Sequence, residues 1–231
     1  MARDFRTRLA RRASKSGVFL DEALASGLVV YYELLARWNR KINLTSLEDP
    51  DEAIDRLLLE PVLAARHLSP AVVDVMDIGS GGGSPALPLA LALGPQVRLT
   101  MVEVKARKSA FLREAVRHLG LTDARVETSR YEELLALPEL HEKFDAVSMR
   151  AVKVESRVLM TLQAFVKPGG SLLLFRGPTG PEIPPGILHP LEWQATIPLV
   201  EALQSRLSIL RKRSANSSSV PRGTTVPARL R

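Results

Sequence analysis

A run of glycines forms the most distinctive candidate ligand site in the sequence. Glycine occupies positions 79, 81, 82 and 83, directly after Asp77-Ile78. The run lies between a strand predicted over residues 72–78 and a helix predicted over 85–93. Glycines allow a close approach of the backbone to a ligand, and the first turn of a helix offers free N–H groups. The pattern predicts a ligand-binding loop; the alternative is a tight strand–helix turn, with Asp77 as a cap.

The acidic residue Glu103 stands at the end of the next predicted strand, over residues 97–102. A carboxylate in this position of an α/β sheet can accept hydrogen bonds from the hydroxyl groups of a ribose. The alternative is a surface carboxylate paired with Lys105 or Lys108. Because the carboxyl end of a strand is where such sheets bind ligands, we favour a binding role for Glu103.

The spacing of the glycines separates two classes of nucleotide site. A dinucleotide fingerprint would place glycine at 79, 81 and 84. Position 84 is serine, and the glycines of the loop fall at 79, 81 and 83. This Gly-x-Gly-x-Gly pattern after an acidic strand end resembles the first motif of S-adenosylmethionine methyltransferases. The cofactor predicted from the resemblance is S-adenosylmethionine, with contacts at Asp77, Gly79, Gly81, Gly83 and Glu103.

Polar residues also follow the third and fourth predicted strands. Arg130 and Glu132 come after the third strand, where methyltransferases hold the adenine ring. Arg150 follows the fourth, at the edge where a methyl group would be delivered. Its guanidinium could hold a methionine carboxylate or an RNA phosphate through two hydrogen bonds. The alternatives are an exposed helix start for Glu132 and an ion pair from Arg150 to Asp145 or Glu132.

Missing residue types restrict the chemistry. The chain has no cysteine, so it has no disulfide, no thiolate metal site and no cysteine nucleophile for methylation of pyrimidine C5. Residues 149–152 read Met-Arg-Ala-Val, without the Asp/Asn-Pro-Pro-aromatic motif of exocyclic-amine methyltransferases. Ring nitrogens, ribose oxygens, small molecules and proteins remain as acceptors. Guanine N7 is a lone-pair nucleophile with no proton to lose, so its methylation needs positioning and no general base. We accordingly predict no acid–base catalytic residue and no metal.

Alternating strand and helix patterns place these residues on a sheet. Strands are expected over 72–78, 97–102, 124–128, 144–149 and 171–175, with weaker ones over 193–197 and 207–210. Helices are expected over 85–93, 105–119 and 155–166, with a short one from Tyr131, a turn at Pro168-Gly169-Gly170 and a loop over 177–190. The alternation predicts an α/β fold with a doubly wound, mostly parallel, seven-stranded sheet.

An N-terminal helical extension precedes this sheet. Apolar residues from Leu24 to Trp38 recur at helical spacing, and Asp49-Pro50 is typical of a helix start. Pro61 should kink or restart that second helix. The predicted organisation is a basic flexible arm over 1–19, mobile or loosely helical, a helical cap over 20–68, a methyltransferase domain over 69–212 and a disordered basic tail over 213–231.

Positive charge is concentrated at the two ends of the chain. The net charge is +7, yet residues 16–204 hold 19 basic and 24 acidic residues, a net of −5. Residues 1–15 and 205–231 supply the excess, so they are either arms that grip phosphates or solvated tails. Without a signal peptide, a long apolar run or cysteine, the sequence fits a cytoplasmic protein.

Taken together, the motifs resemble the 16S ribosomal RNA guanine-N7 methyltransferase G family, whose older name is glucose-inhibited division protein B. The matching pieces run in order over about residues 31–212. They are Trp38-Asn39, Ile42-Asn43-Leu44-Thr45, residues 77–83, Pro85, Pro88-Leu89-Ala90, Val102-Glu103, Lys108, Phe111-Leu112, Leu119-Gly120-Leu121, Arg130, Glu132-Glu133, Asp145 and Arg150-Ala151-Val152. The block Trp-Asn…Asn-Leu-Thr is the most specific, because generic methyltransferases lack it.

The resemblance implies a Rossmann-like class I methyltransferase that acts in the cytoplasm on guanine-N7 of 16S ribosomal RNA. Its cofactor pocket would use Gly79, Ser84, Tyr131, Glu132 and Arg150. The RNA or a small-subunit precursor would contact Arg40, Lys41, Arg150 and Arg176, and the enzyme would be a monomer. The chain departs from the family pattern at Leu57, Glu60, Pro61, Ser84, Ala86 and Arg176.

Two other functions stay open from the sequence. One is methyl transfer to a ribose 2′-oxygen or a small molecule, for which Lys153 is the nearby candidate base. The other is a degenerate family member that binds RNA without catalysis. Asn39, Arg40, Lys41 and Asn43 could face RNA or form a helix cap and turn, and core packing is expected for Trp38.

Overall fold

A seven-stranded sheet forms the centre of the protein. The computed structural model describes residues 2–150, 155–178 and 189–214. The strand order is β3-β2-β1-β4-β5-β7-β6; neighbours from β3 to β5 are parallel, and β5-β7 and β7-β6 are antiparallel. This confirms the doubly wound, mostly parallel sheet. The strands are β1 Asp74–Ile78, β2 Arg98–Val102, β3 Ala124–Glu127, β4 Phe144–Arg150, β5 Val166–Arg176, β6 Leu191–Pro198 and β7 Arg206–Lys212.

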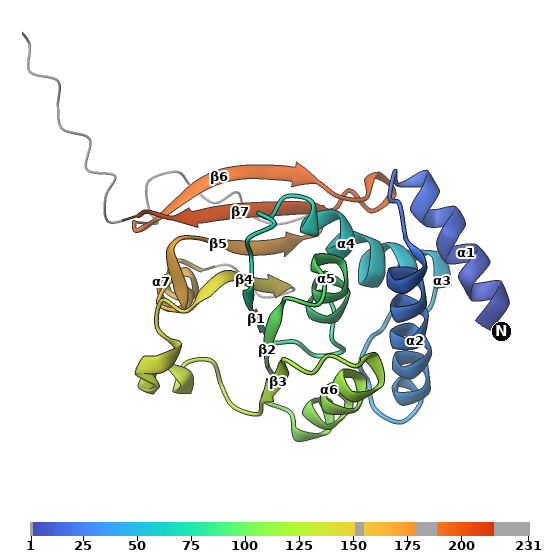
Figure 1. Cartoon of the computed structure of the whole chain (residues 1–231), viewed down its shortest axis with the longest axis horizontal. Helices are drawn as coiled ribbons and strands as arrows, with labels where there is room; N and C mark the ends of the chain where they lie inside the picture. Colours follow the sequence, from blue (N-terminus) through green and yellow to red (C-terminus); the bar gives the residue numbers. More distant parts are fainter. Residues whose placement is uncertain (1, 151–154, 179–188, 215–231) are drawn as a thin grey trace, which may run out of the picture.

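Helices cover both faces of the sheet (Figure 1). One hydrophobic cluster joins one face to the N-terminal helices, α5 and α6, and a second joins the other face to α7 and the short helices after β3. Along β1, Val75 belongs to the first cluster and Met76 to the second, as the alternation of a strand requires. The helices are α1 Ala2–Lys15, α2 Glu22–Asn39, α3 Pro50–Ala53, the π-helix η1 Ile54–Leu59, α4 Glu60–Ala65, α5 Ala86–Leu93, α6 Ala106–Leu119, α7 Ser156–Leu162, and the 3₁₀ turns η2 Glu133–Ala136, η3 Pro138–Leu140 and η4 Glu201–Leu203.

The strand order locates the ligand edge of the sheet. From β1 the chain continues outward through β2 and β3, whereas β4 and β5 lie on the other side of β1. The topological switch point is therefore between β1 and β4. In open α/β sheets, ligands bind in the crevice at the carboxyl ends of the strands flanking such a point.

The N-terminal segment differs from the expected flexible arm. Residues Ala2–Lys15 form the helix α1, which packs against α2 and η1. Leu9 and Ala13 are buried, and the ring of Phe5 stacks on Tyr32 with centroids 4.1 Å apart. The basic residues dominate the sequence of this segment, and their acidic partners lie too far along the chain for a local pattern to reveal them.

Two other expectations are corrected in detail. Pro168-Gly169-Gly170, expected as a turn, lies within β5, where the pairing with β4 shifts register between Phe144 and Ala146. The helix expected over 155–166 ends at Leu162, because the chain already enters β5 at Val166. The loop residues 179–188 and the tail beyond 214 are outside the described residues. No helix in the described ranges is long and apolar enough to span a bilayer.

Candidate cofactor site

The glycine loop between β1 and α5 has a backbone that only glycine adopts readily. Gly79, Gly81 and Gly83 have φ angles of +71°, +51° and +84°. The Gly79 N–H donates to the Val102 carbonyl at 2.9 Å, which ties the loop to the end of β2. A Cβ added at Gly83 would lie 2.7 Å from Cδ1 of Leu87. The loop is therefore both a tight turn and a place where backbone is exposed at the ligand edge.

Glu103 lies directly beside this loop. Its carboxylate accepts hydrogen bonds from the N–H of Gly81 at 2.9 Å and from the N–H of Lys105 at 2.8 Å. The residue is buried. The alternative of a surface carboxylate paired with lysine side chains is wrong, because its contact with Lys105 is to the backbone. Each oxygen keeps a lone pair that can accept a further hydrogen bond.

Asp77 is a buried carboxylate under the loop. The Ser148 hydroxyl donates to its Oδ1 at 2.6 Å across the β1–β4 pair, and its Oδ2 has no protein partner. Burial raises the pKa of the Asp77 carboxyl to about 6, against the hydrogen bond from Ser148 and the positive charge of Arg150. A cationic ligand group near Oδ2 would favour the ionised form.

Arg150, at the end of β4, forms an ion pair with Glu60 of α4. Its Nη1 donates to Oε2 of Glu60 at 2.8 Å and to the Arg56 carbonyl at 2.8 Å, and its guanidinium lies over the ring of Phe175. Its Nε and Nη2 are buried without a protein partner, as is Oε1 of Glu60. Burial lowers the pKa of Arg150, while Glu60 opposes that change. Two donors thus remain for an anionic ligand group.

The alternative of an ion pair from Arg150 to Asp145 or Glu132 is wrong, because Arg150 pairs with Glu60. Asp145 pairs instead with Lys167 at 2.9 Å, and its carboxylate accepts from the backbone N–H groups of Val73 and Asp74 at the start of β1. The partner in the structure is Glu60, which the sequence analysis names only as a departure from the family pattern. A carboxylate directly after the apolar run 57–59 is the signal in the sequence that could have indicated a buried ion pair.

The fold and site geometry can be compared with known proteins. A family model described as rRNA small subunit methyltransferase G matches residues 25–183. The chain belongs to this family. It is 39% identical over 158 residues to the ribosomal RNA small subunit methyltransferase G of Xanthomonas axonopodis, covering 68% of this chain and 71% of the relative. It is 41% identical over 160 residues to the protein of that name from Stenotrophomonas maltophilia, with the same coverage.

A solved structure supports the fold alone. The S-adenosylmethionine-dependent methyltransferase from Aquifex aeolicus superposes with a TM-score of 0.56 at 15% sequence identity. The superposition covers 77% of this chain and 97% of the Aquifex protein.

The block that is most specific for the methyltransferase G family, residues 38–45, packs against the glycine loop. The side chain of Asn39 accepts hydrogen bonds from the N–H groups of Leu44 and Thr45 and donates to the Thr45 carbonyl. This confirms the cap-and-turn interpretation of Asn39. Leu44 lies against Gly82, whose carbonyl accepts a hydrogen bond from Tyr31 at 2.6 Å. The family block thus positions the loop.

Other residues assigned through the family resemblance lie in different surroundings. The Ser84 hydroxyl donates a hydrogen bond to the Leu57 carbonyl of η1 at 2.8 Å, so its proton is already used within the protein. Tyr131 is half-buried against the α7-side cluster, where burial and then Glu132 raise its pKa. Glu132 itself is exposed. The structure brings together Asp77, Gly81, Glu103 and Arg150 most directly, while Lys153 lies outside the described residues.

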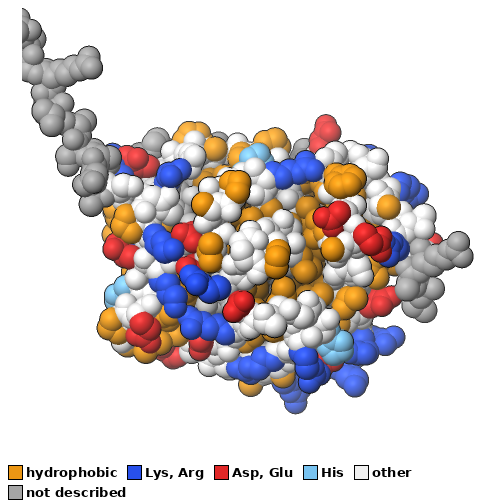
Figure 2. Space-filling model, in the orientation of Figure 1, with side chains coloured by type: hydrophobic (Ala, Val, Ile, Leu, Met, Phe, Trp, Pro, Cys, Tyr) orange, Lys and Arg blue, Asp and Glu red, His pale blue; other side chains and the backbone are white. Residues whose placement is uncertain are grey.

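The expected RNA contacts are separate from this buried cluster. Arg40 and Lys41 are exposed at the carboxyl end of α2. Figure 2 shows Lys and Arg side chains gathered along the lower edge of the molecule, over α6 and the lower end of α2. Arg176 ends β5 and is half-buried, with Nη1 3.5 Å from the Ser208 hydroxyl. Arg150 faces inward, with 15% of its side chain exposed, which favours a ligand role over a phosphate contact.

A large cavity elsewhere is a poor candidate for the reaction. It has a volume of about 660 Å³ and lies among α2, α5 and α6 at the amino ends of β2 and β3. None of its lining residues belongs to the glycine loop or to the Glu60–Arg150 pair. Because parallel α/β sheets bind ligands at the carboxyl edge, we assign the site to the glycine loop.

Proposed function

We propose that this protein transfers a methyl group from S-adenosylmethionine to guanine-N7 of 16S ribosomal RNA. The observation that carries the proposal is the family match over residues 25–183, joined to a glycine loop with Glu103, Asp77 and Arg150 around it. The relatives from Xanthomonas and Stenotrophomonas are named as methyltransferases of small-subunit ribosomal RNA. Guanine-N7 is the finer part of the proposal.

The residues at the site fit the chemical groups of this cofactor. The two unpartnered donors of Arg150 suit a carboxylate, and the unpartnered Oδ2 of Asp77 suits an ammonium group. The Glu103 carboxylate can accept from ribose hydroxyls while it holds Gly81. Gly79 has open space beside it for the ligand, Gly83 allows the loop to pack against Leu87, and Ser84, Tyr131 and Glu132 complete the proposed pocket. When bound, S-adenosylmethionine supplies an electrophilic methyl group on its sulfonium.

The chain's own contribution to the reaction is positioning. Guanine N7 attacks through a lone pair and has no proton to lose, so no side chain has to act as a base. The buried charged groups and the glycine-loop backbone around the proposed site would orient the two reactants in line. No cluster of metal-ligating side chains occurs within the described ranges, and the proposed reaction requires none.

RNA would approach over the surface that surrounds the glycine loop. We propose that Arg40, Lys41 and Arg176 contact phosphates, with the 16S RNA or a small-subunit precursor as partner and the enzyme acting as a monomer. Since the matched relatives come from bacteria, whose ribosomes are cytoplasmic, the cytoplasm is the proposed compartment.

The experiment that tests the proposal is methyl transfer in vitro. The purified protein is incubated with labelled S-adenosylmethionine and 16S ribosomal RNA lacking the modification, either free or in 30S particles, and the product is mapped by nuclease digestion and mass spectrometry. We expect 7-methylguanosine at one position. Product on a ribose oxygen would refute the N7 assignment, and no product with either RNA form from a protein that binds the cofactor would support a non-catalytic family member.

A further inference from the structure

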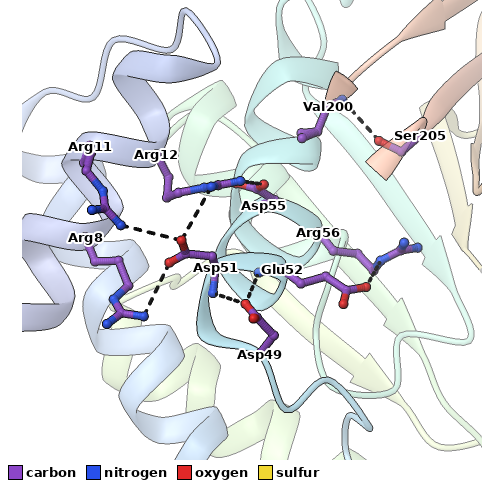
Figure 3. Close-up of polar contacts among 10 residues, drawn as sticks. All are labelled: Arg8, Arg11, Arg12, Asp49, Asp51, Glu52, Asp55, Arg56, Val200 and Ser205. Atoms are coloured by element: carbon purple, nitrogen blue, oxygen red, sulfur yellow. Dashed lines mark hydrogen bonds and ion pairs between the residues drawn. The ribbon is translucent and has the colours of Figure 1, made fainter. Parts of the chain in front are cut away.

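Three arginines of α1 form ion pairs with acidic residues of α3 and η1. Figure 3 shows Arg8, Arg11 and Arg12 directed toward the segment that contains α3 and η1. Asp51 accepts ion pairs from all three, at 3.4 to 3.5 Å. Nearer the N-terminus of the same helix, Arg6 pairs with Glu22 of α2. These ion pairs dock α1 against α2 and the segment that contains α3 and η1, and they offset part of the positive charge of the helix.

One of these pairs is buried. Arg12 donates from Nε to Oδ1 of Asp55 at 2.9 Å and from Nη2 to Oδ2 of the same carboxylate. The Asp55 side chain is fully buried, and 16% of the Arg12 side chain is exposed. The hydrogen bond to Asp55 is the largest cause that raises the pKa of Arg12. Removing one partner of a buried pair leaves an uncompensated charge, which is far more unfavourable than losing a surface pair.

Asp55 lies in the π-helix that supports the cofactor site. Its carbonyl accepts the N–H of Glu60, and Glu60 is the ion-pair partner of Arg150. The next carbonyl, of Arg56, accepts Nη1 of Arg150 at 2.8 Å, and the carbonyl of Leu57 accepts the Ser84 hydroxyl. A single turn of η1 therefore contacts α1 on one side and the end of β4 and the glycine loop on the other.

We propose that Arg12 is a positioning residue for the cofactor site. Through the Asp55 carboxylate it fixes η1, and through η1 it sets the position of Glu60, Arg150 and Ser84. The proposal rests on the proposed use of that site for S-adenosylmethionine. Because α1 precedes the matched range 25–183, this support comes from a helix outside the part of the chain that matches the family model.

The test compares three single variants of the full chain. Arg12→Met removes the charge and keeps the aliphatic stem, Arg12→Lys restores a charge, and Arg11→Met removes an exposed ion pair of the same helix to Asp51. S-adenosylmethionine affinity is measured by calorimetry, the two Michaelis constants by methyl transfer to 16S RNA, and folding by circular dichroism. We expect Arg12→Met to weaken cofactor binding by about tenfold, with an unchanged Michaelis constant for RNA. Arg12→Lys should recover most of the loss, and Arg11→Met should stay within about twofold of wild type.

A second measurement keeps the proposal testable if Arg12→Met does not fold. Coupling between two sites is reciprocal, so bound cofactor should stabilise the docking of α1. In the wild-type protein, saturating S-adenosylmethionine should slow hydrogen exchange at the amides of η1 and α1, compared with the edge strand β6. Unchanged exchange in η1 and α1, or wild-type affinity in folded Arg12→Met, would overturn the proposal. Failure of the wild-type protein to bind S-adenosylmethionine would instead count against the proposed function.

Discussion

Replacing Glu103 gives a quantitative test of the cofactor site. The carboxylate holds the Gly81 and Lys105 N–H groups at 2.9 and 2.8 Å and has free lone pairs toward the ligand edge. Glu103→Ala removes the charged acceptor of two ribose hydroxyls. Charge-assisted hydrogen bonds of this kind contribute about 2–4 kcal/mol together. At 1.4 kcal/mol for each factor of ten, the dissociation constant of S-adenosylmethionine should rise roughly 30- to 700-fold.

Two further variants separate binding from loop structure. Glu103→Gln keeps the shape and one acceptor oxygen, but its NH₂ group faces a backbone donor, so we expect a loss of about half that size. Glu127→Ala is the matched control, because Glu127 is also a glutamate at a strand end: it ends the neighbouring strand β3, in register with Val102. Its ion pair with Arg125 is long, with 3.8 Å between the charged atoms. It should leave affinity unchanged.

Isothermal titration calorimetry on proteins with wild-type circular dichroism supplies the readout. Wild-type affinity in folded Glu103→Ala would refute the reasoning, since the carboxylate would then act only as an anchor for the loop backbone.

Three other predictions follow from the structure. Because the Asp77 pKa is raised to about 6 from the ordinary 3.8, the folded state binds a proton more tightly than the unfolded chain; the unfolding free energy should fall by about 3 kcal/mol as pH rises from about 4 to above 6. Urea denaturation should show this fall disappear in Asp77→Asn, and a persistent fall would implicate other groups. Gly83→Ala should lower the free energy of unfolding by about 1–3 kcal/mol in the same assay. Gly17→Ala is the control and should lower it less, because Gly17 has a similar φ angle but no neighbour within 4 Å. Equal decreases in the two variants would exclude a clash of the new methyl group with Leu87. Deleting 215–231 removes three arginines, so the salt slope of RNA binding should fall by up to about three, as filter binding at several salt concentrations can test, and an equal slope would make the tail passive.

Local sequence patterns were sufficient for the sheet and the loop. The apolar pattern predicted the bounds of β1 and β2 to within two residues. This was possible because a strand buried in a parallel sheet consists mostly of apolar residues. The glycines at 79, 81 and 83 were predictable for a related reason, since positive φ angles restrict the residue type at those positions. Glu103 followed from its place at a strand end.

Contacts between distant segments were beyond such patterns. Arg12 and Asp55 are 43 residues apart, and Arg150 bonds to a carbonyl 94 residues earlier, so no local spacing indicates either contact. The sequence shows the charge of the α1 arginines but not their acidic partners, so it predicts either phosphate-binding arms or solvated tails and does not predict the ion pairs to Asp51 and Asp55. Likewise the register shift at Gly169 depends on how β5 meets β4.

The wider turn of η1 limits how this segment can change by insertion or deletion. A π-turn differs from regular α-helix by roughly one accommodated residue, and in an α-helix each residue turns the chain by about 100°. Deleting one residue within Ile54–Leu59 would remove this extra residue and restore regular α-helix, so α3 and α4 would keep their orientations while the widened turn whose carbonyls accept Arg150 and Ser84 would be lost. Homologues with a segment one residue shorter should therefore keep the helical path and lack the wider turn, so length here and the residue that contacts the end of β4 should vary together.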